Sequence, residues 1–364
     1  MFFQGGFVLS FHPAEGFMSV DTIIDRQSDI SNGHFPDLSL PKLRTYCVCN
    51  LRGGIGKTTI AFNLAFLGDS VLAVDTCPQG NLSYYFDHDY FSGALTNVGS
   101  LIKPHILPGG FGRASHVARL AGATNHFFHD KKTYFIPSAS DLYLLPSQVA
   151  TALNQINTLI GSEFTARRDD IIFGLRDEVQ REIEELNGEV DKCLIDTSPF
   201  FAGATQLAWY ASDALIVPVR TDQQSINSFE LLLATLTSSS SEYRRHVSPD
   251  FSTPKIQLVV LTHCGWSTRP GVSNEPNNQT RVYINKVYDL LRRYKSILTT
   301  DNVDNHILLL DDFLGSGRIS SAMSQPLALL TPRMTRTIDR QKVTVNASVT
   351  KCQNQLKFLC SQIW

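Results

Sequence analysis

Short, nearly continuous apolar runs recur between residues 43 and 262, and they predict the strands of a parallel sheet. Such strands are covered by helices on both faces, so they lack the polar alternation of half-exposed strands. The run at 133–136 is the least continuous of the set. The predicted strands lie at residues 44–50, 70–75, 133–136, 192–196, 214–219 and 256–262.

Segments with helical spacing separate these runs. A glycine-rich turn joins the run at 44–50 to a helix predicted at 58–67, and the run at 70–75 follows at once. This order is a βαβ unit, which implies a parallel sheet. Further helices are predicted at 175–186, 228–236, 281–294 and 320–330. We therefore expect an α/β fold in which a mostly parallel, twisted sheet carries helices on both faces.

Three parts of the chain lack a clear pattern. Residues 1–42 show no regular period and are expected to form a poorly ordered arm, while residues 88–130 receive no assignment. The tail at 336–364 has apolar residues at helical spacing, and we expect it to be helical and docked on the core. A membrane-binding helix is the alternative, but that kind of helix usually has a richer basic face. The apolar positions are Cys352, Leu356, Leu359 and Ile363.

Composition narrows the possible classes of protein further. The chain has 364 residues, of which 43% are hydrophobic and 18% charged, as expected for a protein with a sizeable core. A net charge of −2 gives no overall positive field that would attract nucleic acid, although a local basic patch stays open. The seven cysteines have no paired metal-ligand spacing, and we read them as small buried residues in a reducing compartment.

The turn at residues 52–59 reads RGGIGKTT and lies between an apolar strand and a helix. Glycines let backbone N–H groups turn toward phosphate oxygens, and the positive end of the following helix favours an anion. Lys57 is placed to reach the β- and γ-phosphates, and the Thr58 hydroxyl to bind Mg²⁺. We therefore predict a P-loop that binds a nucleoside triphosphate through Gly53, Gly54, Ile55, Gly56, Lys57, Thr58 and Thr59.

The motif departs from the general P-loop pattern, because Leu51 stands where a first glycine is expected. Instead, RGGIGKTT resembles the deviant Walker A motif, KGGxGKTT, of the ParA/MinD ATPases. Residues 63–65 (NLA), 71–83 (VLAVDTCPQGNLS) and 193–199 (CLIDTSP) resemble other motifs of that family, as does the segment at 214–232. The resemblance covers about residues 43–335 and implies one P-loop ATPase domain there.

The resemblance also implies roles for single residues. Lys57, Thr58 and Thr59 would hold phosphate and Mg²⁺, Asp196 would orient the magnesium shell, and Asp75 would lie beside the same metal. Each acid could instead cap a turn at the end of its strand. ATP as the nucleotide follows from the resemblance alone. His263, at the end of the strand near which the family often reads the base, is a candidate base contact or a surface histidine.

Two departures bear on activity. Arg52 stands where the family has a lysine that crosses the dimer to the partner's phosphates, and an arginine can also bind phosphate oxygens. Cys77 stands where the family has an acid that positions the attacking water, a task for which a thiol is a poor substitute. We therefore expect a weak ATPase, in which binding is retained better than turnover.

ParA-like proteins dimerise around ATP, and many bind DNA without sequence preference through lysines and arginines. One predicted helix and the residues after it carry a group of cations, for which a solvated helix face is the alternative. These cations are Arg281, Lys286, Arg292, Arg293 and Lys295.

The sequence thus predicts an ATP-dependent dimeric switch of the ParA type that partitions DNA or positions a cargo. A nucleotide-binding scaffold with little hydrolysis is the alternative, and an iron–sulfur carrier of the same superfamily is disfavoured by the absence of paired cysteines. The expected partners are a second copy of the chain, a ParB-like or cargo adaptor, and DNA bound without sequence preference. No apolar run is long enough to insert stably in a membrane, so we expect a cytoplasmic protein that associates with the nucleoid where it binds DNA.

Overall fold

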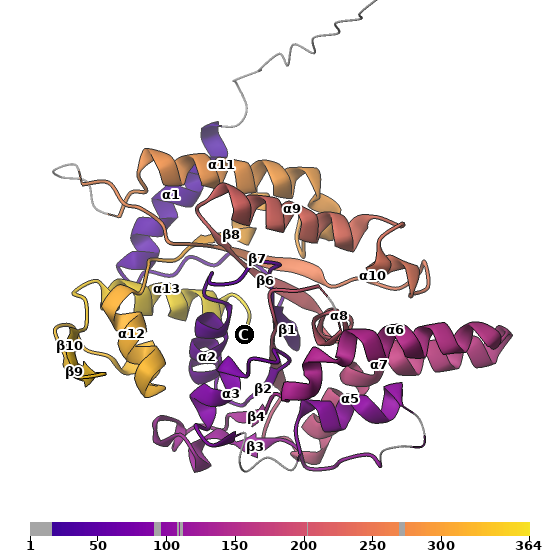
Figure 1. Ribbon diagram of the computed structural model, residues 1–364. Helices are drawn as coiled ribbons and strands as arrows, with labels where there is room; N and C mark the ends of the chain where they lie inside the picture. The colour runs from indigo at the N-terminus through magenta and orange to yellow at the C-terminus, as the bar shows by residue number, and fades with distance from the viewer. Residues whose placement is uncertain (1–16, 91–95, 108, 110–111, 202, 269–273) are drawn as a thin grey trace, which may run out of the picture.

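The computed structural model describes residues 17–90, 96–107, 109, 112–201, 203–268 and 274–364. Its centre is an eight-stranded sheet in the order β3-β4-β2-β5-β1-β6-β7-β8 (Figure 1). Only β3 is antiparallel to its neighbour, so the prediction of a mostly parallel sheet is confirmed. The strands are β1 Thr45–Val48, β2 Val71–Asp75, β3 Arg119–Leu120, β4 Tyr134–Ile136, β5 Lys192–Asp196, β6 Ala214–Arg220, β7 Lys255–Thr262 and β8 Ile307–Leu309.

Helices cover both faces of the sheet, and each face has its own apolar core. One face carries α5 Val98–Ile106, α6 Leu145–Gln155, α7 Gly161–Glu185, α8 Ala204–Tyr210, α9 Gln223–Thr237 and α11 Asn278–Arg293. The other carries α2 Lys57–Gly68, α3 Asn81–Phe86, α12 Leu314–Met323 and α13 Val349–Ser361. The predicted α/β fold with helices on both faces is confirmed.

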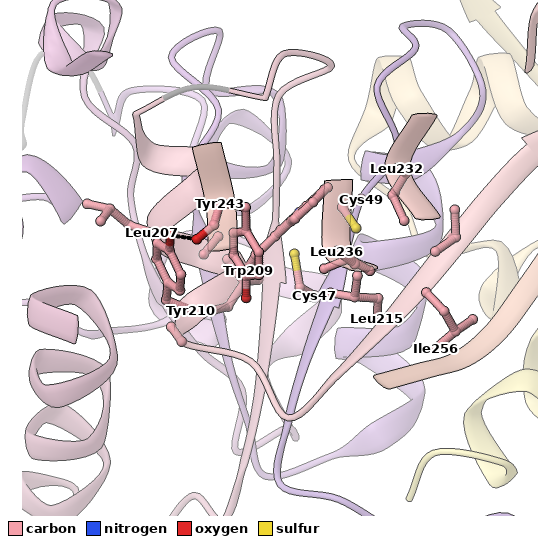
Figure 2. Close-up of a cluster of buried hydrophobic side chains, with 14 of the residues drawn as sticks. Cys47, Cys49, Leu207, Trp209, Tyr210, Leu215, Leu232, Leu236, Tyr243 and Ile256 are labelled. Carbon is pink, nitrogen blue, oxygen red and sulfur yellow. Dashed lines mark hydrogen bonds between the residues drawn. The ribbon is translucent and has the colours of Figure 1, made fainter. Parts of the chain in front are cut away.

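The first core includes a group of aromatic side chains beside β1 (Figure 2). Trp209 is fully buried, and the Tyr210 hydroxyl donates to the main-chain oxygen of Tyr243 at 2.6 Å. Cys47 and Cys49 belong to the same core, as expected for residues two apart on one strand. All seven cysteines are buried, which agrees with their reading as small apolar residues.

The N-terminal arm was predicted wrongly for residues 17–42. Phe17–Ser31 forms helix α1, which contacts α11, α13 and β8, and residues 32–42 bury Leu38 and Leu40. The prediction failed because the partners of α1 lie some 250 residues or more away in the sequence, so its apolar face has no local signature. Residues 1–16 lie outside the described part of the chain.

The C-terminal tail is built into the same body. Helix α13 packs on α1 and α2, and Trp364 lies so close to Gly68 that a side-chain carbon at Gly68 would meet its ring at 2.5 Å. The buried Gln257 amide donates to the main-chain oxygens of Pro41 and Gln362 at 2.9 and 3.0 Å. It therefore joins the segment before β1 and the end of the C-terminal tail to β7. Among the described residues, no helix is both long and apolar enough to cross a bilayer.

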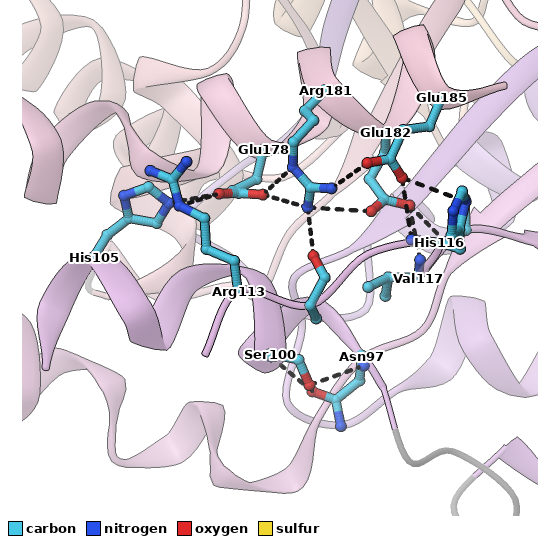
Figure 3. Close-up of polar contacts among 12 residues, drawn as sticks. Asn97, Ser100, His105, Arg113, His116, Val117, Glu178, Arg181, Glu182 and Glu185 are labelled. Carbon is cyan, nitrogen blue, oxygen red and sulfur yellow. Dashed lines mark hydrogen bonds and ion pairs between the residues drawn. The ribbon is translucent and has the colours of Figure 1, made fainter. Parts of the chain in front are cut away.

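Part of the segment 88–130, to which the sequence assigned no structure, is irregular backbone. Side chains of α7 form hydrogen bonds with this backbone at residues 114–118 (Figure 3). The buried Glu182 carboxylate accepts from the amides of Val117 and Ala118 at 2.8 and 2.9 Å, and Arg181 donates to the main-chain oxygen of Ala114 at 2.6 Å. Burial raises the pKa of Glu182, while these amides favour the charged form. Residues 114–118 are therefore fixed by side chains from a distant helix.

The helix predicted at 320–330 was wrong in its C-terminal half. Helix α12 ends at Met323, where Ser324 takes a left-handed conformation with φ 48°. Pro326 follows two residues later, and it restricts the residue before it to extended conformations. The apolar residues at 327–330 that suggested a longer helix instead form a single 3₁₀ turn with buried Leu327.

Candidate nucleotide-binding site

The turn between β1 and α2 adopts the conformation that its glycines allow. Gly54 and Gly56 have φ +69° and +91°, a region that side chains other than glycine rarely occupy. Nothing lies within 4 Å of the position where a Cβ would stand at either residue. The loop therefore leaves its backbone uncovered at these two positions, beside the carboxyl ends of the strands.

Helix α2 begins inside this loop and has no side-chain cap. Its N-cap is Gly56, so no side chain accepts a hydrogen bond from the first turn. Exposed N–H groups and the helix dipole make such an end attractive to an anion. Lys57 is the first residue of α2, is 6% exposed, and donates from Nζ to the main-chain oxygen of Arg52 at 2.7 Å. Its cationic end is thus held at the loop.

Thr58 and Asp196 meet beside this loop. The Thr58 hydroxyl donates to Asp196 Oδ2 at 2.7 Å, and Asp196 ends β5 directly beside Val48 of β1. The other carboxylate oxygen, Oδ1, is buried without a hydrogen-bond partner among the described residues. Burial, and next the charge of Asp75, raise the pKa of Asp196 to about 7. A hydroxyl and an unsatisfied buried carboxylate oxygen are a donor set that suits Mg²⁺.

Asp75 is the neighbour of Asp196 across β2 and β5, but its oxygens are occupied. Oδ1 accepts from the Cys77 amide at 3.0 Å, and Oδ2 accepts from the amide and hydroxyl of Ser83 at 2.8 Å each. Burial raises the pKa of Asp75 to about 6, and the Ser83 and Cys77 bonds oppose that rise. In this arrangement Asp75 positions the loop at 76–83, and its predicted contact with the metal stays a prediction.

Cys77 lies in that loop and is 5% exposed. Its main-chain oxygen accepts from the Ser138 hydroxyl at 2.5 Å and from the Gly80 amide at 2.9 Å. Burial, and next the charge of Asp75, raise the pKa of the thiol to about 12. The thiol is therefore neutral at physiological pH, and it cannot supply the negative charge of a carboxylate at this position.

Arg52 has a partner within its own chain. Its guanidinium forms an ion pair with Asp222, and both side chains are about a quarter to a third exposed. Asp222 also caps α9, because its carboxylate accepts from the Ser225 amide at 2.9 Å. Partial burial raises the pKa of Asp222. The hydrogen bond from the Ser225 amide and then the charge of Arg52 lower it more, so this pKa lies below its usual value. Sequence reasoning missed Asp222, although an acid directly before a predicted helix is a recognised cap signal.

The opposite side of the loop faces the end of β7. The Thr262 hydroxyl donates to the main-chain oxygen of Ile55 at 3.3 Å, which ties the loop to the sheet. His263 follows with φ +57° and lies 4.0 Å from Asp312, between Nε2 and Oδ2. Burial lowers the pKa of His263, and Asp312 opposes this. A contact of His263 with a nucleotide base stays a prediction.

The cations predicted to bind nucleic acid lie on α11 or just after it, as expected, but several have acidic or polar partners. Arg281 pairs with Glu275 at 3.1 Å, and Lys286 donates to the Gln223 amide oxygen at 2.5 Å. Arg293 pairs with Glu230 at 3.1 Å and Lys295 with Asp301 at 3.3 Å. Arg292 also has a partner. The local positive charge of this face is therefore largely offset.

Comparison with known proteins places this geometry in a family. A family model described as an AAA domain matches residues 43–248, more than half of the chain. The chromosome partitioning protein ParA of Caulobacter vibrioides is 28% identical over 267 residues, which cover 69% of this chain and 81% of the relative. The chain belongs to the ParA/MinD family of P-loop ATPases.

Other members of the ParA/MinD family agree with this assignment. The maintenance of carboxysome distribution protein A of Gloeothece citriformis is 26% identical over 189 residues, covering 51% of this chain and 60% of that protein. The structure of apo McdA from Cyanthece has the same fold, with a TM-score of 0.51 at 19% identity over 77% of this chain and 90% of that one. The names of the two sequence relatives, a chromosome partitioning protein and a protein that maintains carboxysome distribution, support the ParA-type prediction over the scaffold alternative.

Proposed function

We propose that this chain is an ATP-dependent dimeric switch that partitions DNA or positions another large cargo in the cytoplasm. The observation that carries the proposal is the pair of Thr58 and Asp196 at the phosphate loop, with one buried carboxylate oxygen left unsatisfied. Bound nucleotide and Mg²⁺ would give that oxygen and the uncapped start of α2 their partners. The names of the relatives, partition and positioning proteins, supply the cargo class.

In this proposal each loop residue has a physical task. The amides of Gly53, Gly54, Ile55 and Gly56 and the first turn of α2 surround the triphosphate. Lys57 leaves the main-chain oxygen of Arg52 and neutralises the phosphates. Thr58 and Thr59 supply hydroxyls, and Thr58 with Asp196 would hold Mg²⁺. The metal would offset charge on the phosphate oxygens.

The dimer is part of the same proposal. Arg52 would exchange its partner Asp222 for a phosphate of the second subunit, so that the ion pair breaks as the dimer forms. A neutral Cys77 thiol in place of a carboxylate leaves the chain without a strong group to orient water. We therefore propose slow hydrolysis, which an adaptor protein would accelerate and which resets the dimer to monomers.

Sedimentation of the full chain with Mg·ATP, with Mg·ADP and with neither tests this proposal. We expect a dimer with ATP alone, and monomers for the Lys57→Ala variant under every condition. The control is Lys131→Ala, which removes a lysine that lies over the ring of Phe66, in the last turn of α2. A wild-type chain that stays monomeric at saturating Mg·ATP would remove the switch.

A further inference from the structure

The C-terminal part of the chain differs sharply in charge from the rest. Between residues 313 and 364 the sequence holds seven lysines and arginines but one acid, Asp339, whereas the whole chain has 32 basic and 34 acidic residues. An asymmetry of this size suggests an anionic partner for that part of the chain. Five of these cations lie on helix α12, in the hairpin of β9 Thr335–Ile338 and β10 Gln341–Thr344 that contacts α12, or in the turn just before this hairpin. They are Arg318, Arg333, Arg336, Arg340 and Lys342.

The hairpin is a separate two-stranded sheet at the edge of the molecule (Figure 1). Ile338 and Val343 pack toward the second core, and Val345, which pairs with Met334, is buried. The Ser316 amide and hydroxyl exchange hydrogen bonds with Asn346 at 3.2 Å each, which fixes α12 beside the hairpin. The hairpin is therefore anchored on one face and open on the other.

The cations of this surface have no acidic partners. Among the described residues, none of the five forms an ion pair, and Arg318, Arg333, Arg340 and Lys342 are exposed. This is the reverse of α11, where Arg281, Arg293 and Lys295 all pair with acids. Cations without an ion pair keep most of their electrostatic attraction for a polyanion, although Asp339 lies beside Arg340 in the hairpin turn.

Two of the arginines stand at positions where glycine would be easier. Arg333 and Arg340 have φ +66° and +64°, and Arg340 occupies the two-residue turn of the hairpin with Asp339. Turns of this kind favour glycine or asparagine, and a side chain such as that of arginine costs on the order of 1–2 kcal/mol there. Arginine at the tip thus places a cation at the most exposed point of the hairpin at some cost in stability.

We propose that the β9–β10 hairpin, together with Arg318 of α12, is a surface that binds the phosphate backbone of double-stranded DNA. Paired strands lie about 4.8 Å apart, and the ~12 Å major groove of DNA admits a two-stranded ribbon of this kind. The deep, narrow groove of RNA helices does not admit one. A membrane surface needs exposed apolar side chains beside the cations. On the hairpin, Ile338 and Val343 face the core, whereas Leu314 and Met323 of α12 are exposed, so binding to vesicles is the competing outcome of the test. The proposal rests on the proposed function for its cargo class and adds the surface that holds it.

The test is fluorescence anisotropy of a labelled mixed-sequence duplex of about 30 base pairs with the full chain and Mg·ATP, from about 50 to 200 mM salt. The hairpin variant is Arg333→Gly, Arg340→Gly, Lys342→Gln, which also relieves two left-handed positions, so we expect an unchanged or higher melting temperature. The matched control is Arg281→Gln, Arg293→Gln, Lys295→Gln on the α11 side, where all three cations pair with acids. We expect the hairpin variant to bind roughly tenfold to a hundredfold more weakly and to lose about three units of salt slope.

The α11 control should change affinity by less than about threefold, because its cations are already paired. The variant Arg333→Lys, Arg340→Lys keeps the charge and should retain most of the affinity, which separates charge from folding. Equal losses in both triple variants, or no loss in the hairpin variant, would overturn the proposal. So would hairpin-dependent binding to RNA duplexes, or to vesicles with ~30% phosphatidylserine, that exceeds binding to DNA.

Binding of a fluorescent ATP analogue, measured on the same samples, separates this inference from the proposed function. We expect the wild type and the hairpin variant to bind the analogue equally, because the hairpin and the phosphate loop share no residue. If the wild type binds no nucleotide, the proposed function fails. If nucleotide binding is intact but DNA binding does not depend on the hairpin, only the inference about the surface fails.

Discussion

The two sides of the candidate site differ in how their buried carboxylates are satisfied. Beside the phosphate loop, Asp196 has a single hydroxyl partner and an unsatisfied oxygen. One strand away, Asp75 accepts three hydrogen bonds and lies beside a neutral thiol. The first side is ready for a ligand, whereas the second is saturated and only holds a loop. In our proposal, nucleotide binding and nucleotide hydrolysis therefore depend on different side chains, so the two can be tested separately.

The largest expected effect is on the phosphate side. Lys57→Ala removes the cation at the loop, and charge-assisted hydrogen bonds contribute about 2–3 kcal/mol. We expect ATP to bind roughly 30- to 150-fold more weakly, as measured by calorimetric titration. Lys57→Arg serves as the control that keeps the charge but alters the geometry. Equal affinity of wild type and Lys57→Ala would show that the loop does not hold the phosphates.

Asp196→Asn is the next largest change. It keeps the shape and the Thr58 contact but removes the charge that would orient Mg²⁺, so the apparent affinity for Mg²⁺ in the presence of ATP should fall about 10- to 100-fold. Asp75→Asn is the matched variant, and it should weaken Mg²⁺ binding far less. If Asp75→Asn has the larger effect on Mg²⁺ affinity, our contrast between the two acids is reversed.

Cys77→Asp tests the saturated side. A carboxylate there restores the acid that the family has, and general acid–base groups contribute roughly 10²- to 10⁴-fold to rates. We expect the steady-state ATPase rate to rise at least about tenfold, with some loss of stability because the new charge is buried beside Asp75. Cys77→Asn, which has the same shape without the charge, should leave the rate unchanged. A rate that stays flat in Cys77→Asp would mean that water is oriented from elsewhere.

The buried acids also predict how stability depends on pH. Burial raises the pKa of Asp196 to about 7 and that of Asp75 to about 6, so the folded chain holds protons that the unfolded chain releases. The unfolding free energy without nucleotide should therefore rise as pH falls from about 8 to 5.5, by on the order of 1–2 kcal/mol from Asp196. Asp196→Asn should lose this part of the rise in urea titrations. A variant with the full rise would refute the assignment.

The smallest expected effect concerns Arg52. Asp222→Asn breaks the ion pair but keeps the cap of α9, because asparagine caps about as well as aspartate. A partly exposed pair contributes about 0.2–1 kcal/mol, so releasing Arg52 should tighten the ATP-dependent dimer roughly two- to fivefold. The dimer dissociation constant from sedimentation measures this. A weaker dimer would show that Asp222 itself contributes to the interface.

The sequence predicted what local pattern encodes. Six strands were predicted because buried parallel strands are continuous apolar runs. The two residues of β3 leave no such run, whereas β8 is a short apolar run that was overlooked. The phosphate loop was predicted because its glycines and lysine are contiguous. Contacts between residues far apart in the sequence were not predicted. They are α1 with α13, Asp222 with Arg52, and the side chains of α7 with residues 114–118. The hairpin cations were missed because sequence does not show which cations have acidic partners.

The most direct test of the account measures ATP affinity and single-turnover hydrolysis on the same preparation of wild-type chain with Mg²⁺. We expect affinity in the micromolar range, about −8 kcal/mol, together with hydrolysis well below about 1 s⁻¹ when no partner is present. Tight binding with slow turnover would agree with an unsatisfied Asp196 that is available to a ligand, and with a fully hydrogen-bonded Asp75 beside a neutral Cys77. Failure to bind ATP at millimolar concentration, or fast hydrolysis by the chain alone, would contradict it.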